Sequence, residues 1–306
     1  MKQYRSFLSM PFIVCMLSLF LLFFFPTQVL SGAKSGLALW FEIVLPTLLP
    51  FLITTNLCME LHIPELLPST LYPVFTGLLS GYPIGAKACA DLCRSGQLSS
   101  IQGQFLLSFC NNASPMFVLN YLFLQILHLK NNFFLPALLL YGSIFLASSI
   151  FFLLHRSQLL HNNKPLLTRT QTKNSTLVDY PPFFTALDSS ILTGFLIITK
   201  IGGYIILFSI LAAFISAFFP FSPVLKGILI GILEITTGIN YLASLGLPNS
   251  QFISLTLMIT VFGGLSSAAQ TNSVISNSSL SLWTYLKYKA LTASICTGLC
   301  ILVYFI

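Results

Sequence analysis

Long apolar runs alternate with short polar interruptions along most of this chain. A helix needs roughly 20 apolar residues to cross about 30 Å of hydrocarbon. The uninterrupted runs of about that length lie near 7–29, 37–60, 133–154, 188–218 and 288–306. The pattern therefore predicts an all-helical protein that passes through a membrane several times.

Three further regions, 70–96, 100–129 and 223–276, are apolar but contain glycines, prolines, amides or a carboxylate. A backbone that leaves the helix inside lipid loses hydrogen-bond partners, at a cost of several kcal/mol for each group. Such a break persists only where protein or a water-filled cavity satisfies those groups. We predict re-entrant hairpins at 70–96 and 223–245, and broken helices at 100–129 and 250–277.

The N-terminal run follows Lys2 and Arg5, and so has the form of a signal peptide as well. Its apolar stretch extends beyond Phe25, whereas the apolar core of a signal peptide has about 7–15 residues. We therefore interpret it as a first membrane span.

One long polar segment, 155–182, divides the chain near its middle. It is too short and too polar to form a domain, which indicates a linker. The predicted organisation is an N-terminal span at 1–32, a first repeat at 33–154, this cytoplasmic linker, and a second repeat at 183–306.

Short polar motifs recur in the two halves at a common spacing. The motif "FCNNAS" at 109–114 aligns with "FGGLSS" at 262–267, and "GLLSGYPIG" at 77–85 aligns with "GILEITTG" at 231–238. Each half then reads as span, polar hairpin, broken helix and span. The sequence therefore predicts two inverted repeats, an arrangement in which transporters bring broken helices together near the bilayer midplane.

Composition agrees with a membrane protein. Hydrophobic residues make up 56% of the chain and charged residues only 7%, whereas about 25% of a soluble domain is charged. The net charge of +7 comes from basic residues scattered between the apolar runs, which indicates bilayer orientation rather than nucleic-acid binding.

With the N-terminus inside, most basic residues fall on the cytoplasmic side. These residues are Lys2, Arg5, Lys87, Arg94, Arg156, Lys164, Arg169, Lys173, Lys287 and Lys289. Lys34, Lys130 and Lys226 fall outside. The positive-inside rule therefore favours a multi-pass protein with a cytoplasmic N-terminus.

The tip of the first hairpin is one candidate for contact with a solute. Its predicted contacts are Ser80, Gly81, Tyr82 and Gly85. Glycines permit a close backbone approach, and the two side chains can hydrogen bond. The alternative is an ordinary cytoplasmic turn, in which Lys87 pairs with Asp91 four residues later.

The break in the first half lies at Asn111, Asn112 and Ser114, deep within an apolar run. Adjacent asparagines are costly there, which favours a functional break. The alternative is a set of polar contacts that hold neighbouring helices together.

The second half carries a carboxylate between Leu233 and Ile235. Glu234 can accept hydrogen bonds from a solute or carry a proton or a cation; the alternative is a structural ion pair with Lys226 or Lys200. The remaining predicted contacts are Thr237, Gly263, Gly264, Ser266 and Gln270. For the paired glycines the alternative is tight small-residue packing.

No motif points to catalysis or to a bound metal. The sequence contains no HExxH, P-loop or Gly-x-Ser-x-Gly motif, and the seven cysteines form no CxxC pair. We therefore expect no enzyme activity, no metal and no cofactor.

Four motifs in order, "SGYPIGAK", "FCNNASP", "LEITTG" and "GGLSSAAQ", resemble the family of the bacterial sporulation integral membrane protein YlbJ. That family is related to nucleoside recognition or Gate-domain proteins, whose repeats look like the core of concentrative nucleoside transporters. The resemblance covers about residues 35–300. It implies an endospore-forming bacterium, a role in spore formation, a transporter-like fold and a place in the bacterial cytoplasmic membrane.

Two functions follow as hypotheses. The first is a transporter-type protein that binds or moves a small polar solute, such as a nucleoside-like metabolite. The second is a non-transporting membrane scaffold of a sporulation complex. The expected partners are the lipid bilayer and an unidentified solute, not nucleic acid; a coupling ion and a homo-oligomer are both compatible with the fold.

Overall fold

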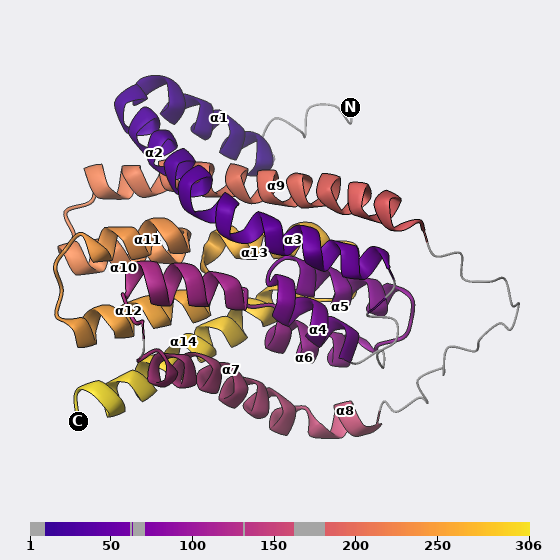
Figure 1. The fold of residues 1–306 in the computed structure, drawn as a ribbon. Helices are drawn as coiled ribbons and strands as arrows, with labels where there is room; N and C mark the ends of the chain where they lie inside the picture. Colours follow the sequence, from indigo (N-terminus) through magenta and orange to yellow (C-terminus); the bar gives the residue numbers. More distant parts are fainter. Residues whose placement is uncertain (1–9, 62, 64–70, 131, 162–180) are drawn as a thin grey trace, which may run out of the picture.

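The computed structural model describes residues 10–61, 63, 71–130, 132–161 and 181–306, and these form helices and turns with no strand (Figure 1). Several helical stretches are long and apolar enough to cross a membrane. They are Pro26–Glu60, Phe134–Leu154, Phe183–Phe218, Asn249–Ile275 and Leu282–Tyr304. The expected all-α, multi-pass membrane fold is therefore confirmed. Most of the predicted linker, together with Lys2, Arg5 and the sites at 164, 169 and 173, lies outside the described residues.

The first predicted span does not have the expected bounds. Helix α1 (Met10–Phe24) ends before Pro26, which begins α2 (Pro26–Ala38). Proline cannot continue a helix, because it lacks the amide proton and its ring clashes with the preceding turn, but it fits the first position of a new one. The run at 7–29 is thus divided, and the next span starts at Pro26 rather than near residue 37.

Helix α2 continues through a π-helical turn, η2 (Leu39–Val44), into α3 (Leu45–Glu60). The widened turn lies just before Pro46, where one amide donor is missing, and Pro50 lies within α3. Helix α9 (Phe183–Phe218) lies beside this long helix in Figure 1. Its 36 residues span about 54 Å, which is longer than the roughly 30 Å of hydrocarbon in a bilayer.

The side chain of Trp40 joins these two long helices by a hydrogen bond and by packing. The Trp40 indole Nε1 donates a hydrogen bond to the Ile198 carbonyl at 2.9 Å. A Cβ atom added to Gly202 would lie only 2.6 Å from the same indole. The glycine therefore provides the space that the ring occupies.

Gly202→Ala is expected to lower the free energy of unfolding by about 1–3 kcal/mol, because overpacking against the Trp40 ring outweighs the gain in helix propensity. The neighbouring Gly203→Ala is the matched control, since a Cβ there meets no atom within 4 Å. Thermal unfolding of the purified variants in detergent measures both effects. Equal unfolding temperatures for the two variants would show that the Trp40 ring does not need the space at Gly202.

The two halves repeat one order of helices. The first half contains α4 (Leu71–Ser80), α5 (Ile84–Arg94), α6 (Ser100–Cys110), η4 (Phe117–Ile126), α7 (Phe134–Leu154) and the short α8 (Arg156–His161). The second contains α10 (Pro223–Leu233), α11 (Ile235–Ala243), α12 (Asn249–Phe262), α13 (Gly264–Ile275) and α14 (Leu282–Tyr304). In Figure 1 the pair α4–α5 lies toward one end of the molecule, and α10–α11 toward the opposite end, near the C-terminus.

Both helical pairs close on a contact between glycines. A Cβ on Gly85 would lie 2.9 Å from Gly77 Cα, and one on Gly238 would lie 2.2 Å from Gly231 Cα. These are the residues that bound the motifs aligned in the sequence. The recurring motif therefore corresponds to one physical feature, a backbone-to-backbone approach at the tip of each hairpin.

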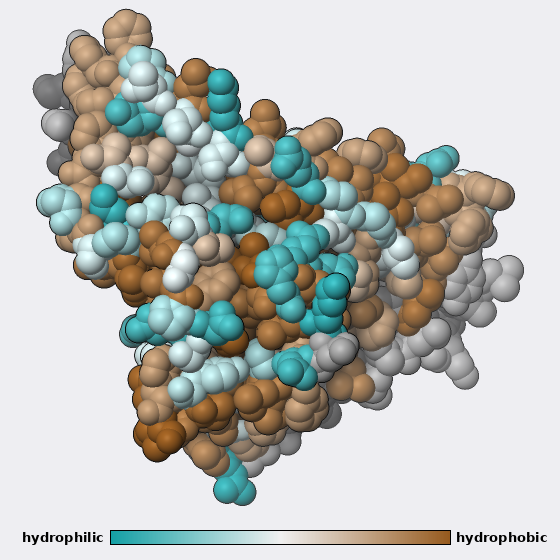
Figure 2. Space-filling view, turned by 60° about the vertical axis from the view of Figure 1, so that its left-hand side comes forward, coloured by the Kyte–Doolittle hydropathy of each residue, from teal (hydrophilic) through white to brown (hydrophobic). Residues whose placement is uncertain are grey.

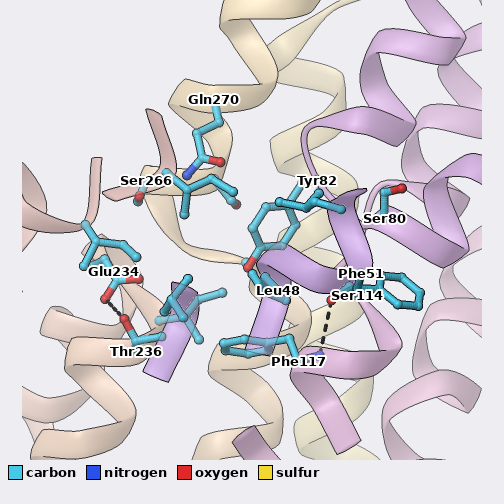
Figure 3. A pocket seen from close by; sticks show the side chains of 17 residues that line it. Leu48, Phe51, Ser80, Tyr82, Ser114, Phe117, Glu234, Thr236, Ser266 and Gln270 are labelled. Atoms are coloured by element: carbon cyan, nitrogen blue, oxygen red, sulfur yellow. Dashed lines mark hydrogen bonds between the residues drawn. The ribbon is translucent and has the colours of Figure 1, made fainter. Parts of the chain in front are cut away.

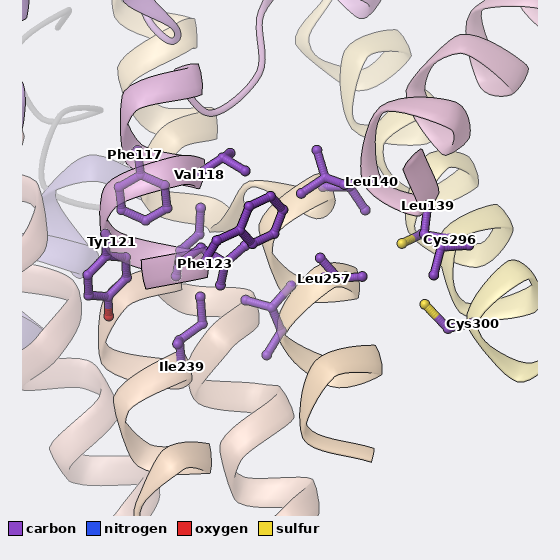
Figure 4. Close-up of a cluster of buried hydrophobic side chains, with 14 of the residues drawn as sticks. Phe117, Val118, Tyr121, Phe123, Leu139, Leu140, Ile239, Leu257, Cys296 and Cys300 are labelled. Atoms are coloured by element: carbon purple, nitrogen blue, oxygen red, sulfur yellow. The ribbon is translucent and has the colours of Figure 1, made fainter. Parts of the chain in front are cut away.

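Each broken helix passes from its own half into the other. Phe117, Val118, Tyr121 and Phe123 of η4 are buried in one cluster with residues of α11 and α12 of the second half and of α7 of the first (Figure 4). Conversely, Ile275 at the end of α13 is buried with residues of α5 and α6. The breaks in the two helices therefore lie where the halves cross.

Arg94 fixes one of these crossings at the surface. Its guanidinium pairs with Asp91 at 2.7 Å and donates to the carbonyls of Val274 and Asn277 at 2.8 and 3.3 Å. A cation is favourable there because the C-terminal carbonyls of α13 carry partial negative charge. The proposed Lys87–Asp91 pair is not formed, and the Lys87 side chain is exposed.

Candidate functional site

The first hairpin and the first broken helix satisfy each other's open backbone groups. Helix α4 ends at Ser80, and Gly81 follows with φ +71°. The Tyr82 amide then donates to the Asn112 carbonyl at 3.0 Å. A Cβ on Gly81 would lie 2.7 Å from Ser114 N. The glycine is therefore required both for its backbone conformation and for the close approach of the two segments.

Asn111 joins several elements rather than facing an open space. Its side-chain oxygen accepts from the Ala86 amide at 3.2 Å, and its nitrogen donates to Thr271 Oγ1 and Tyr285 Oη at 2.9 and 3.1 Å. The Tyr285 hydroxyl also donates to the Asn111 carbonyl. Asn111 is fully buried. This geometry matches the alternative role considered for the motif, polar contact between helices.

Asn112 holds a buried lysine. The Lys289 ammonium donates to Asn112 Oδ1, and Asn112 Nδ2 donates to the Phe109 carbonyl at 2.6 Å. Lys289 is only 2% exposed, and its nitrogen lies 5.5 Å from the centre of the Tyr285 ring. Lys289, which was expected on the cytoplasmic side, is thus buried inside the protein rather than exposed to solvent. The residue lies about two turns inside α14, on the face that also buries Tyr285, whereas Lys287 is exposed.

Glu234 forms the break of the second hairpin. It is extended, with φ −146° and ψ 125°, between α10 and α11. Its Oε2 accepts from Thr236 Oγ1, from the Thr237 amide at 2.7 Å and from Thr237 Oγ1 at 2.8 Å. The carboxylate thus caps α11, whose N-terminus favours negative charge. No described hydrogen bond uses the other carboxylate oxygen, Oε1.

The structural ion pair considered for Glu234 is not formed. Among the described residues, no Lys or Arg is paired with this carboxylate. The Lys226 ammonium donates to the Ser216 carbonyl at 3.0 Å, and Lys200 is exposed on α9. Glu234 is nevertheless only 5% exposed. A buried carboxylate without a cationic partner in a membrane protein indicates a function.

The second break brings α13 against this hairpin. Gly263 and Gly264 have φ of +89° and +73°, which separates α12 from α13. A Cβ on Gly264 would lie 3.3 Å from the Leu233 carbonyl. In each half, therefore, a glycine allows the hairpin and the broken helix to approach closely, at Gly264 and Leu233 in the second half and at Gly81 and Ser114 in the first.

A cavity lies where the two halves meet. Its polar lining comes from Ser80, Tyr82 and Ser114 of the first half and from Glu234, Thr236, Ser266, Ser267 and Gln270 of the second (Figure 3). Leu48 and Phe51 of α3 and Ile201 and Ile205 of α9 complete it with apolar side chains. In Figure 3 the Tyr82 ring lies between the Glu234 side and the Ser80 side.

The cavity gathers about half of the predicted contacts. Those that line it are Ser80, Tyr82, Ser114, Glu234, Gly263, Ser266 and Gln270. Those that lie beside it are Gly81, Gly85, Asn111, Asn112, Thr237 and Gly264. The second group shapes the breaks or bonds to neighbouring helices. Sequence reasoning missed Thr236 as a lining residue. It also missed the walls from α3 and α9, because ordinary apolar helix residues carry no distinguishing signal.

Two buried polar atoms of the cavity have no hydrogen-bond partner. They are Ser80 Oγ and Gln270 Oε1, in residues that are 7% and 4% exposed. Leaving such an atom unpaired costs about 1–3 kcal/mol, and native proteins contain few of them. A third unpartnered atom, Asn56 Nδ2, lies on α3 away from the cavity. The two residues come from opposite halves and line the same cavity, although the Ser80 hydroxyl points away from Tyr82 in Figure 3.

The cavity is small. Its free volume of about 50 Å³ holds a few water molecules, whereas pockets for drug-sized ligands have about 300–1,000 Å³. A larger solute therefore requires the apolar walls from α3 and α9 to move apart.

Comparisons with known proteins give one similarity. The chain is similar to the sporulation integral membrane protein YlbJ of Bacillus subtilis (strain 168), with 33% identity over 108 residues. The similar region covers 30% of this chain and 26% of that protein, so the match spans about a quarter of the curated relative. No family model matches the chain. No solved structure matches it. The similarity supports the resemblance that the four sequence motifs indicate.

Proposed function

We propose that the protein binds and moves a small polar solute at the cavity between its halves, and that this activity serves spore formation. The observation that carries the proposal is that Ser80, Gln270 and Glu234 line one cavity, and that Ser80 Oγ and Gln270 Oε1 are buried without a hydrogen-bond partner. Polar atoms that a protein buries without partners are available to a ligand. Broken helices and hairpins at such a place are the architecture of solute sites in transporters.

The lining favours a neutral or cationic solute that carries hydrogen-bond donors. The cavity contains the Glu234 carboxylate and no Lys, Arg or His. Two like charges 4 Å apart repel by about 4 kcal/mol at an effective dielectric constant of 20. The positive end of α11 does not offset this repulsion, because Glu234 already caps it. A nucleoside-like metabolite meets the chemical requirement, once the cavity widens.

The arrangement of helices supports movement as well as binding. The hairpins lie toward opposite ends of the molecule, and each broken helix crosses from one half into the other (Figure 1). The apolar wall belongs to α3 and α9, the two long helices that pack on each other. We propose that this pair tilts against the hairpins and opens the cavity to one side at a time.

The link to spore formation rests on the similar protein, whose name is sporulation integral membrane protein YlbJ. In the source organism, deletion of the gene is expected to lower the yield of heat-resistant spores. Full complementation by Glu234→Gln, together with loss of function when 162–180 is exchanged for a Gly/Ser linker, would instead indicate a scaffold.

Glu234→Gln is expected to weaken solute binding roughly 10- to 150-fold, because a hydrogen bond to a charged group contributes about 1.5–3 kcal/mol. Tracer uptake into proteoliposomes and ligand-induced thermal shifts, with a panel of nucleosides, nucleobases and small amines, measure the effect. Glu42→Gln is the control, since Glu42 is exposed on η2 and does not line the cavity. Neither uptake nor a shift with any member of the panel, or equal behaviour of the Glu234 variant and the wild type, would refute the proposal.

A further inference from the structure

A second polar surface lies apart from the cavity, in a groove of about 430 Å³ between α2, α9 and the hairpin α10–α11. Thr27 and Ser35 of α2 line it, as do Ser209 and Ser216 of α9. Within each helix these residues are spaced seven or eight positions apart, so they lie on one face. A continuous face of hydroxyl groups is better matched to water or protein than to hydrocarbon, in which a hydroxyl can bond only to its own helix or to a neighbouring side chain, as Thr27 Oγ1 does with Gln28 Oε1.

The groove runs inward from one end of the molecule. Its outer residues are Thr27, Ser216 and Tyr241, which lie near the start of α2, the end of α9 and the end of α11. These helix ends lie together at the left of Figure 1, and Figure 2 turns this side forward and shows hydrophilic side chains gathered on it. From Thr27 to Ser35, eight residues along α2, the groove extends about 12 Å.

At its inner end the groove meets the carboxylate of the cavity. Ser209 Oγ lies 2.7 Å from Thr237 Oγ1, and Thr237 Oγ1 donates to Glu234 Oε2 at 2.8 Å. Ser209 and Thr237 both line the groove, whereas Glu234 lines the cavity. A continuous chain of two hydroxyls therefore connects the groove with Glu234 without passing through the cavity.

We propose that this groove is a water-filled path through which Glu234 exchanges a proton with the compartment at that end of the protein. A hydronium ion in the groove gives its proton to Ser209 Oγ, the Ser209 hydroxyl proton passes to Thr237 Oγ1, and the Thr237 hydroxyl proton passes to Glu234 Oε2. The reverse sequence returns the proton to water. This path rests on the proposed function and extends it, because it identifies the proton as the ion that binds at the solute site.

Few other titratable groups act on this carboxylate. Of the described residues, Tyr82 of the first hairpin and Tyr121 of η4 are close enough to interact with its charge. On α9 the Lys200 side chain is exposed, and on α10 Lys226 is bonded to the Ser216 carbonyl. Among the described residues, no Lys, Arg or His forms an ion pair with Glu234.

Cysteine labelling tests whether the groove holds water. In a background with Cys15, Cys58 and Cys93 replaced by serine, single cysteines are placed at Ala213 and Ser216 in the groove, and at Leu207 and Leu211 on the exposed face of α9. A charged methanethiosulfonate added at the groove end is expected to modify the first pair roughly tenfold faster or more, because thiolates form in water and not in hydrocarbon. Equal rates for the two pairs would overturn the path. Solute is not needed, so this result is independent of the uptake assay.

Infrared spectroscopy tests the proton relay. The carbonyl band of protonated Glu234 is identified as the band that Glu234→Gln removes, and its shift in D₂O is timed. Thr237→Val is expected to slow this exchange roughly tenfold or more, because it breaks the chain of hydroxyls. Thr236→Val is the matched control, since Thr236 donates to the same oxygen but lines the cavity and not the groove. Equal exchange in the two variants, or no Glu234 band at any pH at which the protein stays folded, would overturn the relay.

Discussion

Replacement of Asn112 by leucine is expected to lower the free energy of unfolding by roughly 3–5 kcal/mol, the cost of leaving a buried charge without its partner. The Lys289 ammonium donates to Asn112 Oδ1 and is 2% exposed, and no described carboxylate is paired with it. Leucine has the same number and branching of side-chain heavy atoms as asparagine, so the variant removes the acceptor without opening a cavity. Chemical unfolding in detergent measures the effect.

The matched variant removes the charge instead of its acceptor. Lys289→Met keeps an unbranched apolar stem and leaves only the neutral Asn112 oxygen unpaired, which costs about 1–3 kcal/mol. The double variant Asn112→Leu/Lys289→Met is expected to be more stable than Asn112→Leu alone, because neither buried partner remains. If Asn112→Leu costs no more than Lys289→Met, the ammonium is not held by Asn112.

Hydrophobic periodicity predicts the existence of the long helices well and their ends less well. The run at 133–154 corresponds closely to α7, which covers Phe134–Leu154. Pro26, in contrast, lies within an apolar run and still separates two helices, because the chemistry of its ring overrides hydropathy. A hydropathy pattern reports how apolar a segment is. The end of a helix, in contrast, can depend on whether one residue has a backbone N–H group to donate.

Polar residues in apolar runs identify the neighbourhood of the site but not its lining. Ser80 and Asn111 look alike in the sequence, as isolated polar residues beside a break. Ser80 Oγ has no partner in the structure. Asn111, in contrast, bonds to Thr271 and Tyr285, which follow it by 160 and 174 residues in the sequence. Such partners are set by how the halves cross, which a local pattern does not contain.

The pattern of charges along the sequence likewise did not predict the burial of Lys289. The positive-inside rule assigns a lysine near the end of an apolar run to the cytoplasm. The structure buries Lys289 because the break at Asn112 supplies an oxygen at that depth. The spacing of Tyr285 and Lys289, four residues apart on one face, is the sequence signal that could have suggested it.

Gly238→Ala is expected to destabilise the protein by about 3 kcal/mol or more, because the new methyl group would lie 2.2 Å from Gly231 Cα and 2.4 Å from Gly231 N. Backbone atoms cannot rotate away, so the hairpin has to open. Gly85→Ala, at 2.9 Å from Gly77 Cα, is expected to cost less. Gly298→Ala on α14 meets no atom within 4 Å and is expected to be neutral or to stabilise by up to about 1 kcal/mol.

The order of the three variants tests whether the glycine pairs hold the two hairpins in the same way. Gly238 lies one helical turn after Glu234, and its amide donates to the Glu234 carbonyl at 3.0 Å. Opening this hairpin therefore displaces the carboxylate from the cavity. Any folded fraction of Gly238→Ala should lose solute-induced stabilisation, whereas Gly298→Ala should retain it, as measured by thermal shift. A Gly238 variant that is as stable as the Gly298 variant would show that the hairpin tolerates separation, and that its glycines are not what positions Glu234.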